Sequence, residues 1–375
     1  MTGRYEQKKP KKKKSPVKVL LIVLLVIALL LVVGLGIFYF FIWKPMLNKV
    51  NYVQMPPKTE PVVLSTTEPT HQTQPSEDNE ATTEPTTVET TIPEMKPEDI
   101  INILVVGQSS RDGEEAKMAD TMILVSMNTY TKTLTLTSVL RDTFAWIPPY
   151  GSHGEGRNKI TNCYALGYHY TGETAVAMQM INECMEHNFG VEVDYNVEID
   201  FEQFINIIDY LGGVLIDLNE AEVDYLNKDT FFVKEEVHVG QNRLNGMTAL
   251  SFARMRHAQG DRGDITRTER QQRLIEALIN QFRGMSVLEL QKVASDCVLP
   301  FITTNMDPNT ITSTLLKCLP MLTDLKIEKG SCPYEGSYWG ELLDIYGDGT
   351  EHSILRFDEN ANKKHMRAIT EGEGG

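Results

Sequence analysis

The sequence predicts an α/β domain, an α-β-α sandwich in which helices cover both faces of a central mixed sheet. Two observations predict this class. The continuous apolar runs at residues 101–107 and 121–128 are typical of strands that are buried on both faces. Residues 201–211 place Phe201, Phe204, Ile207 and Leu211 on one helical face. Strands that alternate with such helices favour a sheet between two helical layers.

The remaining elements follow in order along the chain. Thr and Leu alternate after the second strand, which predicts a hairpin turning near residues 128–132. A helix is expected at 173–187, and a strand near 195–199. Beyond residue 211 we expect a strand at 214–218, a helix capped by Asn245, an amphipathic helix at about 265–282, two further helices after 285 and a late strand at 352–357.

An uncharged apolar stretch at residues 19–43 precedes this domain. A helix of that length crosses a hydrocarbon core of about 30 Å. Lysines cluster in residues 1–18, whereas only Lys44 lies close on the other side. The positive-inside rule therefore predicts a cytoplasmic basic tail, one transmembrane signal-anchor and an extracellular remainder. The alternative is a secretory signal peptide, whose apolar region is usually only about 7–15 residues long.

Residues 44–98 are predicted to be an extracytoplasmic linker. Thr, Pro and Glu dominate from about residue 56 to 97, with too few apolar side chains to offset the entropy of ordering a backbone. The net charge of −15 is attributed mostly to this segment and to the outer surface. No basic DNA-reading helix is evident, so nucleic acid is not an expected partner. The globular domain is expected to span residues 99–372.

The sequence lacks the motifs that several common catalytic chemistries require. The sequence has no G-x-S-x-G, Walker A or H-E-x-x-H motif, and its histidines lack ligand spacing. The cysteines also lack zinc-site spacing. Their odd number leaves at least one free thiol, and Cys297 and Cys318 are expected either to form a disulfide or to remain buried thiols. The five cysteines are Cys163, Cys184, Cys297, Cys318 and Cys332.

Charged residues at the ends of the predicted elements are the candidates for chemistry. Guanidinium groups present a planar fork that matches phosphate oxygens, and the first turn of a helix adds positive partial charge. A convergence of such groups predicts a pyrophosphate site. The alternative is an ion-pair network with Glu269, Asp261 and Asp264 as partners. The candidates are Asp120 before a strand, Arg141 and Asp142 after one, Arg254 and Arg256 after a helix, and Arg267 and Gln271 in the first turns of the next.

The arginines of "RTERQQRLI" are not expected to be equivalent. Arg267 and Gln271 share a helical face that we expect to meet the anion, and Arg267 is expected to be a surface residue that contributes little packing. Arg270 is expected to form a structural ion pair beside them, and Arg273 to point to solvent. Apolar side chains near this site are expected either to line a lipid channel or simply to pack in the core. They are Phe201, Phe204, Leu250 and Phe252.

The ordered set "ADTMILVSMN", "SVLRDT", "KITNCYALG", "LNGMTALSFARMR" and "DITRTERQQRLIEALI" resembles the LytR-CpsA-Psr family of bacterial cell-envelope enzymes. The resemblance runs from about residue 100 to the C-terminal region. It implies a membrane-anchored, extracytoplasmic phosphotransferase. Its donor would be a glycopolymer of teichoic acid or capsule type on a polyprenyl pyrophosphate carrier, and its acceptor peptidoglycan.

The resemblance also implies roles for particular residues. Asp120 matches the position that holds Mg²⁺, and Asp142 is our candidate for the base. Two departures stand out: Ser109 replaces a metal-binding aspartate in "GQSSR", and Met118 replaces an arginine. Asp112 is a candidate to compensate. The residues that match pyrophosphate-binding positions are Arg111, Arg141, Arg254, Arg256, Arg267 and Gln271, with Arg141 and Arg267 also expected to be catalytic.

Two rival functions remain open from the sequence. The first is a module that binds envelope polymer or prenyl pyrophosphate without chemistry, which the loss of the carboxylate at Ser109 favours. The second is a pyrophosphatase that hydrolyses the lipid carrier. Transcriptional regulation fits poorly, because the domain is expected outside the cell.

Overall fold

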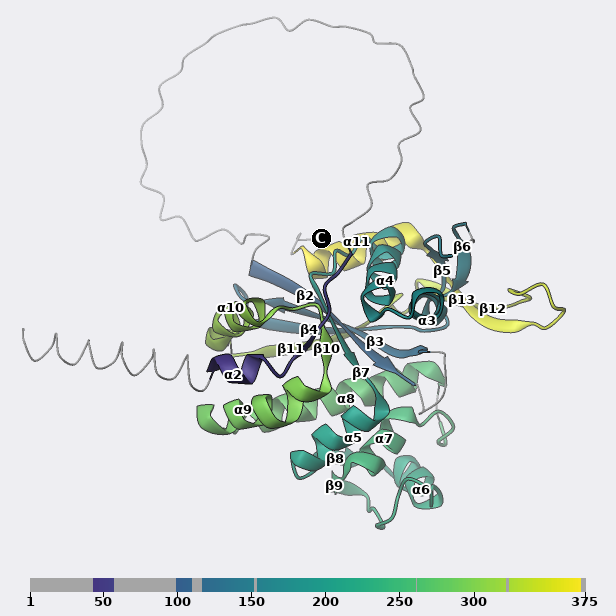
Figure 1. The fold of residues 1–375 in the computed structure, drawn as a ribbon. Helices are drawn as coiled ribbons and strands as arrows, with labels where there is room; N and C mark the ends of the chain where they lie inside the picture. Colours follow the sequence, from purple (N-terminus) through teal and green to yellow (C-terminus); the bar gives the residue numbers. More distant parts are fainter. Residues whose placement is uncertain are drawn as a thin grey trace, which may run out of the picture.

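The computed structural model describes residues 43–56, 99–109, 117–151, 154–260, 262–321 and 324–371 (Figure 1). Within these ranges no helix has the length and apolar character needed to cross a membrane. The span expected at residues 19–43 lies outside the described residues except for Trp43, as does most of the expected linker.

A seven-stranded mixed sheet forms the centre of the molecule, in the order β1-β10-β7-β2-β3-β4-β11. β2, β3 and β4 are antiparallel neighbours, whereas β7 joins β2 and β11 joins β4 in parallel. Asn128 pairs with Thr133, which confirms the predicted hairpin. The strands are β1 (Asn51–Tyr52), β2 (Ile100–Gln108), β3 (Ala119–Asn128), β4 (Thr133–Val139), β7 (Tyr195–Ile199), β10 (Thr303–Thr304) and β11 (Lys326–Cys332).

Helices cover both faces of this sheet, which confirms the predicted α/β class (Figure 1). One face carries α3 (Ile160–Thr171), α4 (Thr174–Phe189) and α11 (Glu359–Thr370). The other face carries α8 (Asp264–Arg283), with α9 (Val287–Val293) and α5 (Phe201–Tyr210) nearby. The bounds of α8 lie within a residue or so of those expected from its apolar periodicity.

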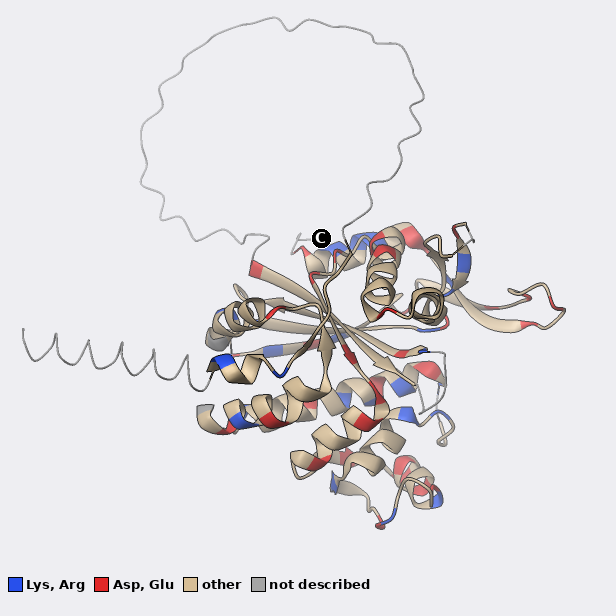
Figure 2. Ribbon diagram, viewed as in Figure 1, with Lys and Arg blue, Asp and Glu red and all other residues tan. Residues whose placement is uncertain are grey.

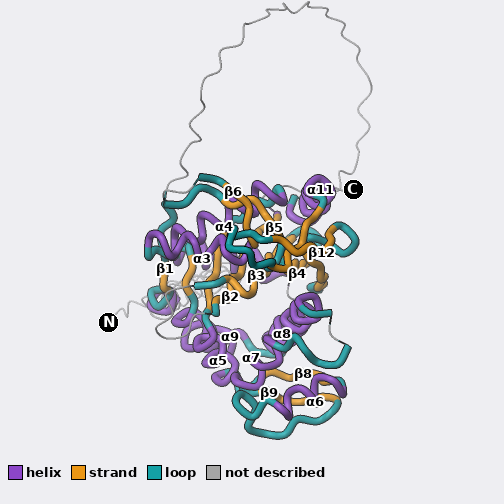
Figure 3. The backbone as a smooth tube through the Cα atoms, turned by 90° about the vertical axis from the view of Figure 1, so that its right-hand side faces the viewer, coloured by secondary structure: helices purple, strands orange, loops and turns teal. Residues whose placement is uncertain are grey.

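A smaller lobe lies beyond α8 (Figure 3). It contains β8 (Val214–Leu218), α6 (Glu220–Lys228), β9 (Gly240–Leu244) and α7 (Gly246–Arg254), and it has a hydrophobic core of its own. The strand expected at 214–218 pairs with β9 and stands apart from the central sheet. Asn245 caps α7 as predicted, since its side chain accepts a hydrogen bond from the Thr248 amide at 2.9 Å.

Two hairpins and α10 (Pro308–Cys318) lie outside the central sheet, and one of these hairpins is in the C-terminal region. The late strand expected at 352–357 is β13 (His352–Phe357), which pairs with β12 (Tyr338–Leu343). The second hairpin joins β5 (Phe144–Ile147) to β6 (Gly156–Lys159). These hairpins extend the molecule beside α3 and α4 (Figure 1).

Part of the expected linker is folded onto the domain. Residues 44–47 form the short helix α2 (Lys44–Leu47), and β1 pairs with β10. Met46 and Leu47 are each only 3% exposed, in a cluster with Leu299. Apolar side chains in this stretch therefore gain enough burial to order it, and residues 44–56 belong to the folded part of the chain.

All five cysteines are described, and all are free thiols. Cys297 is buried, whereas Cys318 is partly exposed and its sulfur lies 3.7 Å from that of Met127. Of the two alternatives for Cys297 and Cys318, the structure therefore shows free thiols.

Candidate functional site

Strand ends and the first turn of α8 bring three of the predicted residues together. Arg141 lies two residues after the end of β4, and Asp120 is the second residue of the antiparallel β3, so the two meet at the same edge of the sheet. The Arg141 Nη1 atom donates to Asp120 Oδ1 at 2.7 Å. From α8, Arg267 Nη2 donates to the Asp120 carbonyl oxygen at 3.2 Å. Figure 2 shows basic and acidic segments gathered where α8 approaches the sheet.

A β-bulge places Asp120 in this position. Gly107 pairs with Thr121 but Gln108 pairs with Ala119, which leaves Asp120 as an extra residue. The Met118 carbonyl oxygen accepts from the amides of both Ser109 and Asp120, at 3.1 and 3.0 Å. Bulges redirect side chains and are common beside active sites.

Asp264, the first residue of α8, links the two arginines. Its Oδ1 atom lies 2.6 Å from Arg267 Nη2 and 3.4 Å from Arg141 Nε. Burial raises the pKa of the Asp264 carboxyl, although Arg267 and Arg141 oppose the shift. Neither carboxylate oxygen has an aligned hydrogen-bond donor among the described residues, so charge is the main contribution to both contacts.

Asp264 was expected only as an ion-pair partner and not as part of the site. The usable signal was its spacing: it lies three residues before Arg267, on the same helical face, and directly follows Gly263. Its contact with Arg141 joins residues more than 120 positions apart, so local spacing does not reveal it.

Arg267 is buried, which corrects our expectation of a surface residue. Its side chain is 3% exposed, and burial, with smaller contributions from Arg141 and Arg256, lowers its pKa to about 10 although Asp264 opposes the shift. It stays protonated at neutral pH. The Nε atoms of Arg267 and Arg141 are buried without a hydrogen-bond partner among the described residues.

Arg256 completes a group of three guanidinium groups. Burial lowers its pKa, and the next cause is repulsion from Arg141. It forms no ion pair within the described part of the chain. Gln271, on the Arg267 face of α8, donates from Nε2 to the Ala253 carbonyl oxygen at 3.3 Å and so ties α8 to α7. Like charges held this close favour an anion between them.

Asp142 lies beside this group and is held by a second cation. Lys159 Nζ donates to Asp142 Oδ1 at 2.9 Å, and Arg141 Nε lies 3.7 Å from Oδ2. Lys159 precedes α3 directly, and β6 brings it next to β5. The described cluster thus contains four cations, Arg141, Arg256, Arg267 and Lys159, against the carboxylates of Asp120, Asp142 and Asp264.

Arg254 is not brought into contact with this cluster in the described structure. Its guanidinium stacks on the rings of Phe201 and Phe232, at 4.8 and 5.4 Å from their centroids. Arg256 lies two residues beyond Arg254, after the end of α7. Arg111, Asp112 and Asp261 lie outside the described residues.

The other arginines of α8 serve the smaller lobe. Arg270 is buried and donates from Nε to Glu222 Oε1 at 3.0 Å, as expected for a structural ion pair. The solvent position expected for Arg273 is wrong: its Nη1 donates to the same Glu222 at 2.6 Å, and its guanidinium lies 5.1 Å from the Phe252 ring centroid. A buried carboxylate is costly unless it is paired with a cation. Glu222 is only 1% exposed and pairs with both arginines.

The four apolar candidates for a lipid channel divide into two pairs. Leu250 and Phe252 are 5% and 0% exposed, and Phe252 belongs to the core of the smaller lobe. Core packing therefore describes these two. Phe201 and Phe204 on α5 stay partly exposed.

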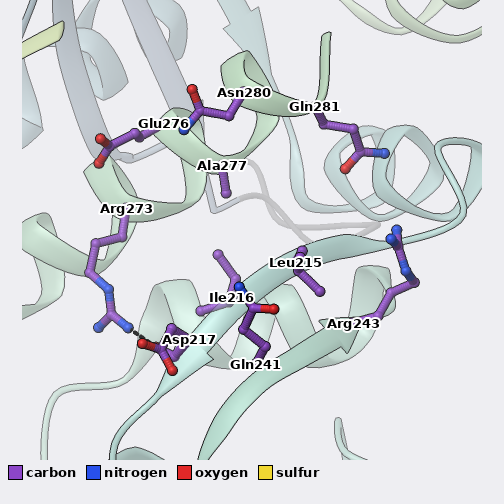
Figure 4. Close-up of a pocket in the computed structure, with 10 residues that line it drawn as sticks. All are labelled: Leu215, Ile216, Asp217, Gln241, Arg243, Arg273, Glu276, Ala277, Asn280 and Gln281. Atoms are coloured by element: carbon purple, nitrogen blue, oxygen red, sulfur yellow. Dashed lines mark hydrogen bonds between the residues drawn. The ribbon is translucent and has the colours of Figure 1, made fainter. Parts of the chain in front are cut away.

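A separate cavity of about 590 Å³ lies between α8 and the β8–β9 hairpin. Figure 4 shows Arg273, Glu276 and Asn280 on its helical side and Leu215 and Gln241 on its strand side. None of the predicted site residues lines it. The arginine cluster is thus distinct from this groove.

Asp120 lies among few described side chains that could hold a metal ion. Within the described ranges, no group of three or more His, Cys, Asp or Glu side chains is arranged to hold one. Mg²⁺ in phosphate sites commonly takes one or two carboxylates and fills its other positions with phosphate oxygens and water. The Asp120 carboxylate, which pairs with Arg141 in this structure, would supply one ligand of such a sparse donor set.

Comparisons with known proteins show what the whole chain is similar to. The model of the LytR_cpsA_psr family matches residues 62–363. The chain is 28% identical over 268 residues to the regulatory protein MsrR of Staphylococcus aureus (strain COL), covering 71% of this chain and 73% of MsrR. It is 33% identical over 190 residues to the polyisoprenyl-teichoic acid–peptidoglycan teichoic acid transferase TagU of Bacillus licheniformis, covering 50% and 54% of the two chains.

A solved structure has the same fold. It is the LytR-CPS2A-psr family protein YwtF (TagT) with bound octaprenyl pyrophosphate lipid, with a TM-score of 0.51 and 21% identity over 75% of this chain and 95% of that chain. At this identity the likeness concerns the fold.

Proposed function

Because the chain belongs to the LytR-CpsA-Psr family, we propose that it is an extracytoplasmic phosphotransferase. It takes a glycopolymer of teichoic acid or capsule type from a polyprenyl pyrophosphate carrier and joins it to peptidoglycan. Residues 19–43 anchor it in the membrane, with residues 1–18 in the cytoplasm. The name of TagU and the octaprenyl pyrophosphate held by TagT support this donor and acceptor class.

The observation that carries the proposal is the arginine cluster. Arg141, Arg256 and Arg267 converge although Arg141 lowers the pKa of the other two and Arg256 lowers that of Arg267. Their mutual repulsion costs electrostatic free energy, which a bound anion would offset. A pyrophosphate has enough charge and enough acceptor oxygens to occupy all three forks. The first turn of α8 adds its amide dipoles to the same place.

The apolar carrier needs a dry surface next to these cations. On the face of the sheet that α8 covers, Val105, Val197 and Ile199 point inward but stay partly exposed. Val125 and Phe204 are partly exposed in the same layer. Covering these partly exposed apolar side chains with a prenyl chain buries apolar surface, which is favourable. We assign the carrier to this layer, between α8, α5 and the sheet.

The chain's residues then act by positioning and charge neutralisation. The acceptor hydroxyl oxygen forms a bond to the phosphorus that carries the glycopolymer, and the bond from this phosphorus to the bridging oxygen breaks. Polyprenyl phosphate leaves with the electron pair, and Arg141, Arg256 and Arg267 offset the charge on it. Asp142 accepts the hydroxyl proton. Mg²⁺ held by Asp120, where bound, supplies further neutralisation of phosphate charge.

Replacement of Arg256 tests this proposal, because Arg256 contacts no carboxylate in the described structure and Arg256→Ala leaves the fold intact. The full chain in nanodiscs is incubated with a labelled prenyl-pyrophosphate disaccharide, peptidoglycan and Mg²⁺. We expect about a 100-fold loss of transfer, the usual effect of deleting one preorganised donor. The matched control is Arg262→Ala, which removes an arginine that is 52% exposed and pairs with Glu269.

Two results would exclude the proposal. Wild-type protein that binds the carrier but yields no covalent peptidoglycan product is a binding module. Release of the disaccharide phosphate at the same rate without peptidoglycan identifies a pyrophosphatase. Equal transfer by Arg256→Ala and Arg262→Ala would show that the arginine cluster takes no part in the reaction.

A further inference from the structure

A buried carboxylate, Glu198, lies on the far side of the sheet from the arginine cluster. It is the fourth residue of β7, is 3% exposed and faces α3 and α4. Its Oε1 atom accepts from Gln108 Nε2 at 2.6 Å and from Lys117 Nζ at 3.2 Å. Its Oε2 atom accepts from the hydroxyl of Tyr164, which is fully buried. The mechanism above uses none of these groups.

Lys117 contacts several side chains in this cluster. Besides Glu198, its ammonium lies 3.4 Å from Thr174 Oγ1 and 4.2 Å from the centroid of the Tyr168 ring. Its side chain is 20% exposed. Enclosing an ion pair in an otherwise apolar layer costs desolvation free energy, and a hydrophobic pair would often be as stable. The location of the pair therefore needs a reason other than stability.

That location coincides with the bulge at Asp120. Gln108 is the last residue of β2 and pairs with Ala119, and Lys117 lies just before β3. Met118, between Lys117 and Ala119, supplies the carbonyl oxygen that accepts from the Ser109 and Asp120 amides. One carboxylate thus binds a side chain from each of the two chain segments whose pairing creates the bulge.

We infer that Glu198 is a positioning residue: by binding Gln108 and Lys117 together it fixes the bulge that directs Asp120 toward Arg141 and Arg267. The inference deepens the proposed function and rests on it for its effect on catalysis. The link runs through the sheet, because Glu198 and Asp120 act on opposite faces. Charge alone is insufficient, since the side chain must be long enough to reach both segments.

Hydrogen exchange tests the positioning role without any assay of activity. Full-length wild-type protein is compared with Glu198→Gln and Glu198→Asp, the second of which keeps the charge on a shorter side chain. The matched control is Asn196→Ala, on the same strand and face, where a fully buried amide bonded to Asn182 at 2.8 Å is removed away from the bulge. Each variant's unfolding free energy is measured in denaturant, so that exchange is compared at known stability.

We expect the Ser109 and Asp120 amides to exchange at least 10-fold faster in both Glu198 variants than in Asn196→Ala, with the amides of Ile123 and Val125 unchanged. Transfer assays should show kcat lowered about 10-fold with KM for the carrier within about 3-fold, because donor binding by the arginines survives. Asn196→Ala should keep the wild-type kcat.

Exchange in the Glu198 variants that matches Asn196→Ala would overturn the inference. So would wild-type exchange and kcat in Glu198→Asp, since charge without reach would then suffice. Faster exchange at the bulge in a chain whose wild-type form performs no transfer would retain the positioning role and reject the proposed function. The two failures are therefore distinguishable.

Discussion

The two faces of the central sheet differ in how completely they are covered. On the face under α3, α4 and α11, Leu104, Val106 and Leu124 are each 0% exposed. On the face toward α8 and α5, Val105 and Val125 remain partly exposed although they alternate with those residues along the same strands. The side chains are of the same kind, so the difference comes from the covering layer.

The two faces therefore contribute differently to the stability of the fold and to the proposed function. The first face, closed by helices that pack directly on it, contributes to a large buried hydrophobic core. The second face is closed only in places, by Ile275 and Ile279 of α8 near β4 and by Leu299 near β10. Arg141 lies at the edge of this second face, Arg267 on α8, which covers it, and Arg256 in the segment between α7 and α8. We expect mutations on the two faces to have different consequences.

The largest expected effect is that of Arg267→Ala. It leaves Asp264 buried without its 2.6 Å partner, which should lower the free energy of unfolding by about 3–5 kcal/mol. It should also lower affinity for a prenyl pyrophosphate more than 10-fold, because the fork of donors is lost. Denaturant unfolding and binding to a fluorescent prenyl pyrophosphate measure the two effects.

The matched control for this change is Arg270→Ala on the same helix. Arg270 is equally buried and also has a carboxylate partner, Glu222, but in the smaller lobe. It should lose comparable stability and keep its affinity for the pyrophosphate. Equal loss of affinity in the two variants would mean that instability, not the missing guanidinium, explains the Arg267 result.

Two adjacent valines give a closer comparison of the faces. Val106→Ala removes methyl groups from the closed core and should cost about 1–3 kcal/mol, whereas Val105→Ala should cost less than about 1 kcal/mol. For the affinity of a long prenyl pyrophosphate the order should reverse, with the larger loss in Val105→Ala. Thermal unfolding and titration with carriers of different chain length test both orders.

The same order in both measurements would contradict the assignment of the carrier to the α8 side. A short-chain pyrophosphate serves as the internal control, because it occupies the arginine cluster without reaching the valines and should bind both variants equally.

The smallest expected effect is a loss of stability at alkaline pH from thiols on the closed face. Burial raises the pKa of Cys163 and of Cys332 well above 9.0. Unfolded thiols ionise near that value while the folded chain keeps its protons, so the folded state binds more protons above pH 9. The free energy of unfolding should therefore fall as pH rises beyond 9. Denaturant unfolding at several pH values measures the slope.

A Cys163→Ala/Cys332→Ala variant should show a shallower slope over the same range. Under native conditions a thiol reagent should modify the partly exposed Cys318 before these two. Rapid native-state labelling of Cys163 would show that the first face is less closed than described.

The sequence predicted where the candidate site lies better than it predicted the contacts of its side chains. Arg141, Asp120 and Arg267 were expected together because each lies at the end of an element, and element ends in an α/β fold meet at sheet edges. The burial of Arg267, the stacking of Arg254 on Phe201 and the pairing of Arg273 with Glu222 were not expected. These contacts depend on which tertiary neighbours surround each side chain. Helical periodicity gives no information about those neighbours.

Sequence alone determined the α/β class, the hairpin turning at 128–132 and the bounds of α8, because periodicity, caps and glycine positions act over a few residues. Only the tertiary structure decided that β8 and β9 leave the central sheet, that Asp264 links Arg141 to Arg267, and that Glu198 binds both segments at the bulge. These contacts join residues dozens of positions apart. Their partners are selected by the packing of whole layers, in which burial, charge and reach are satisfied together.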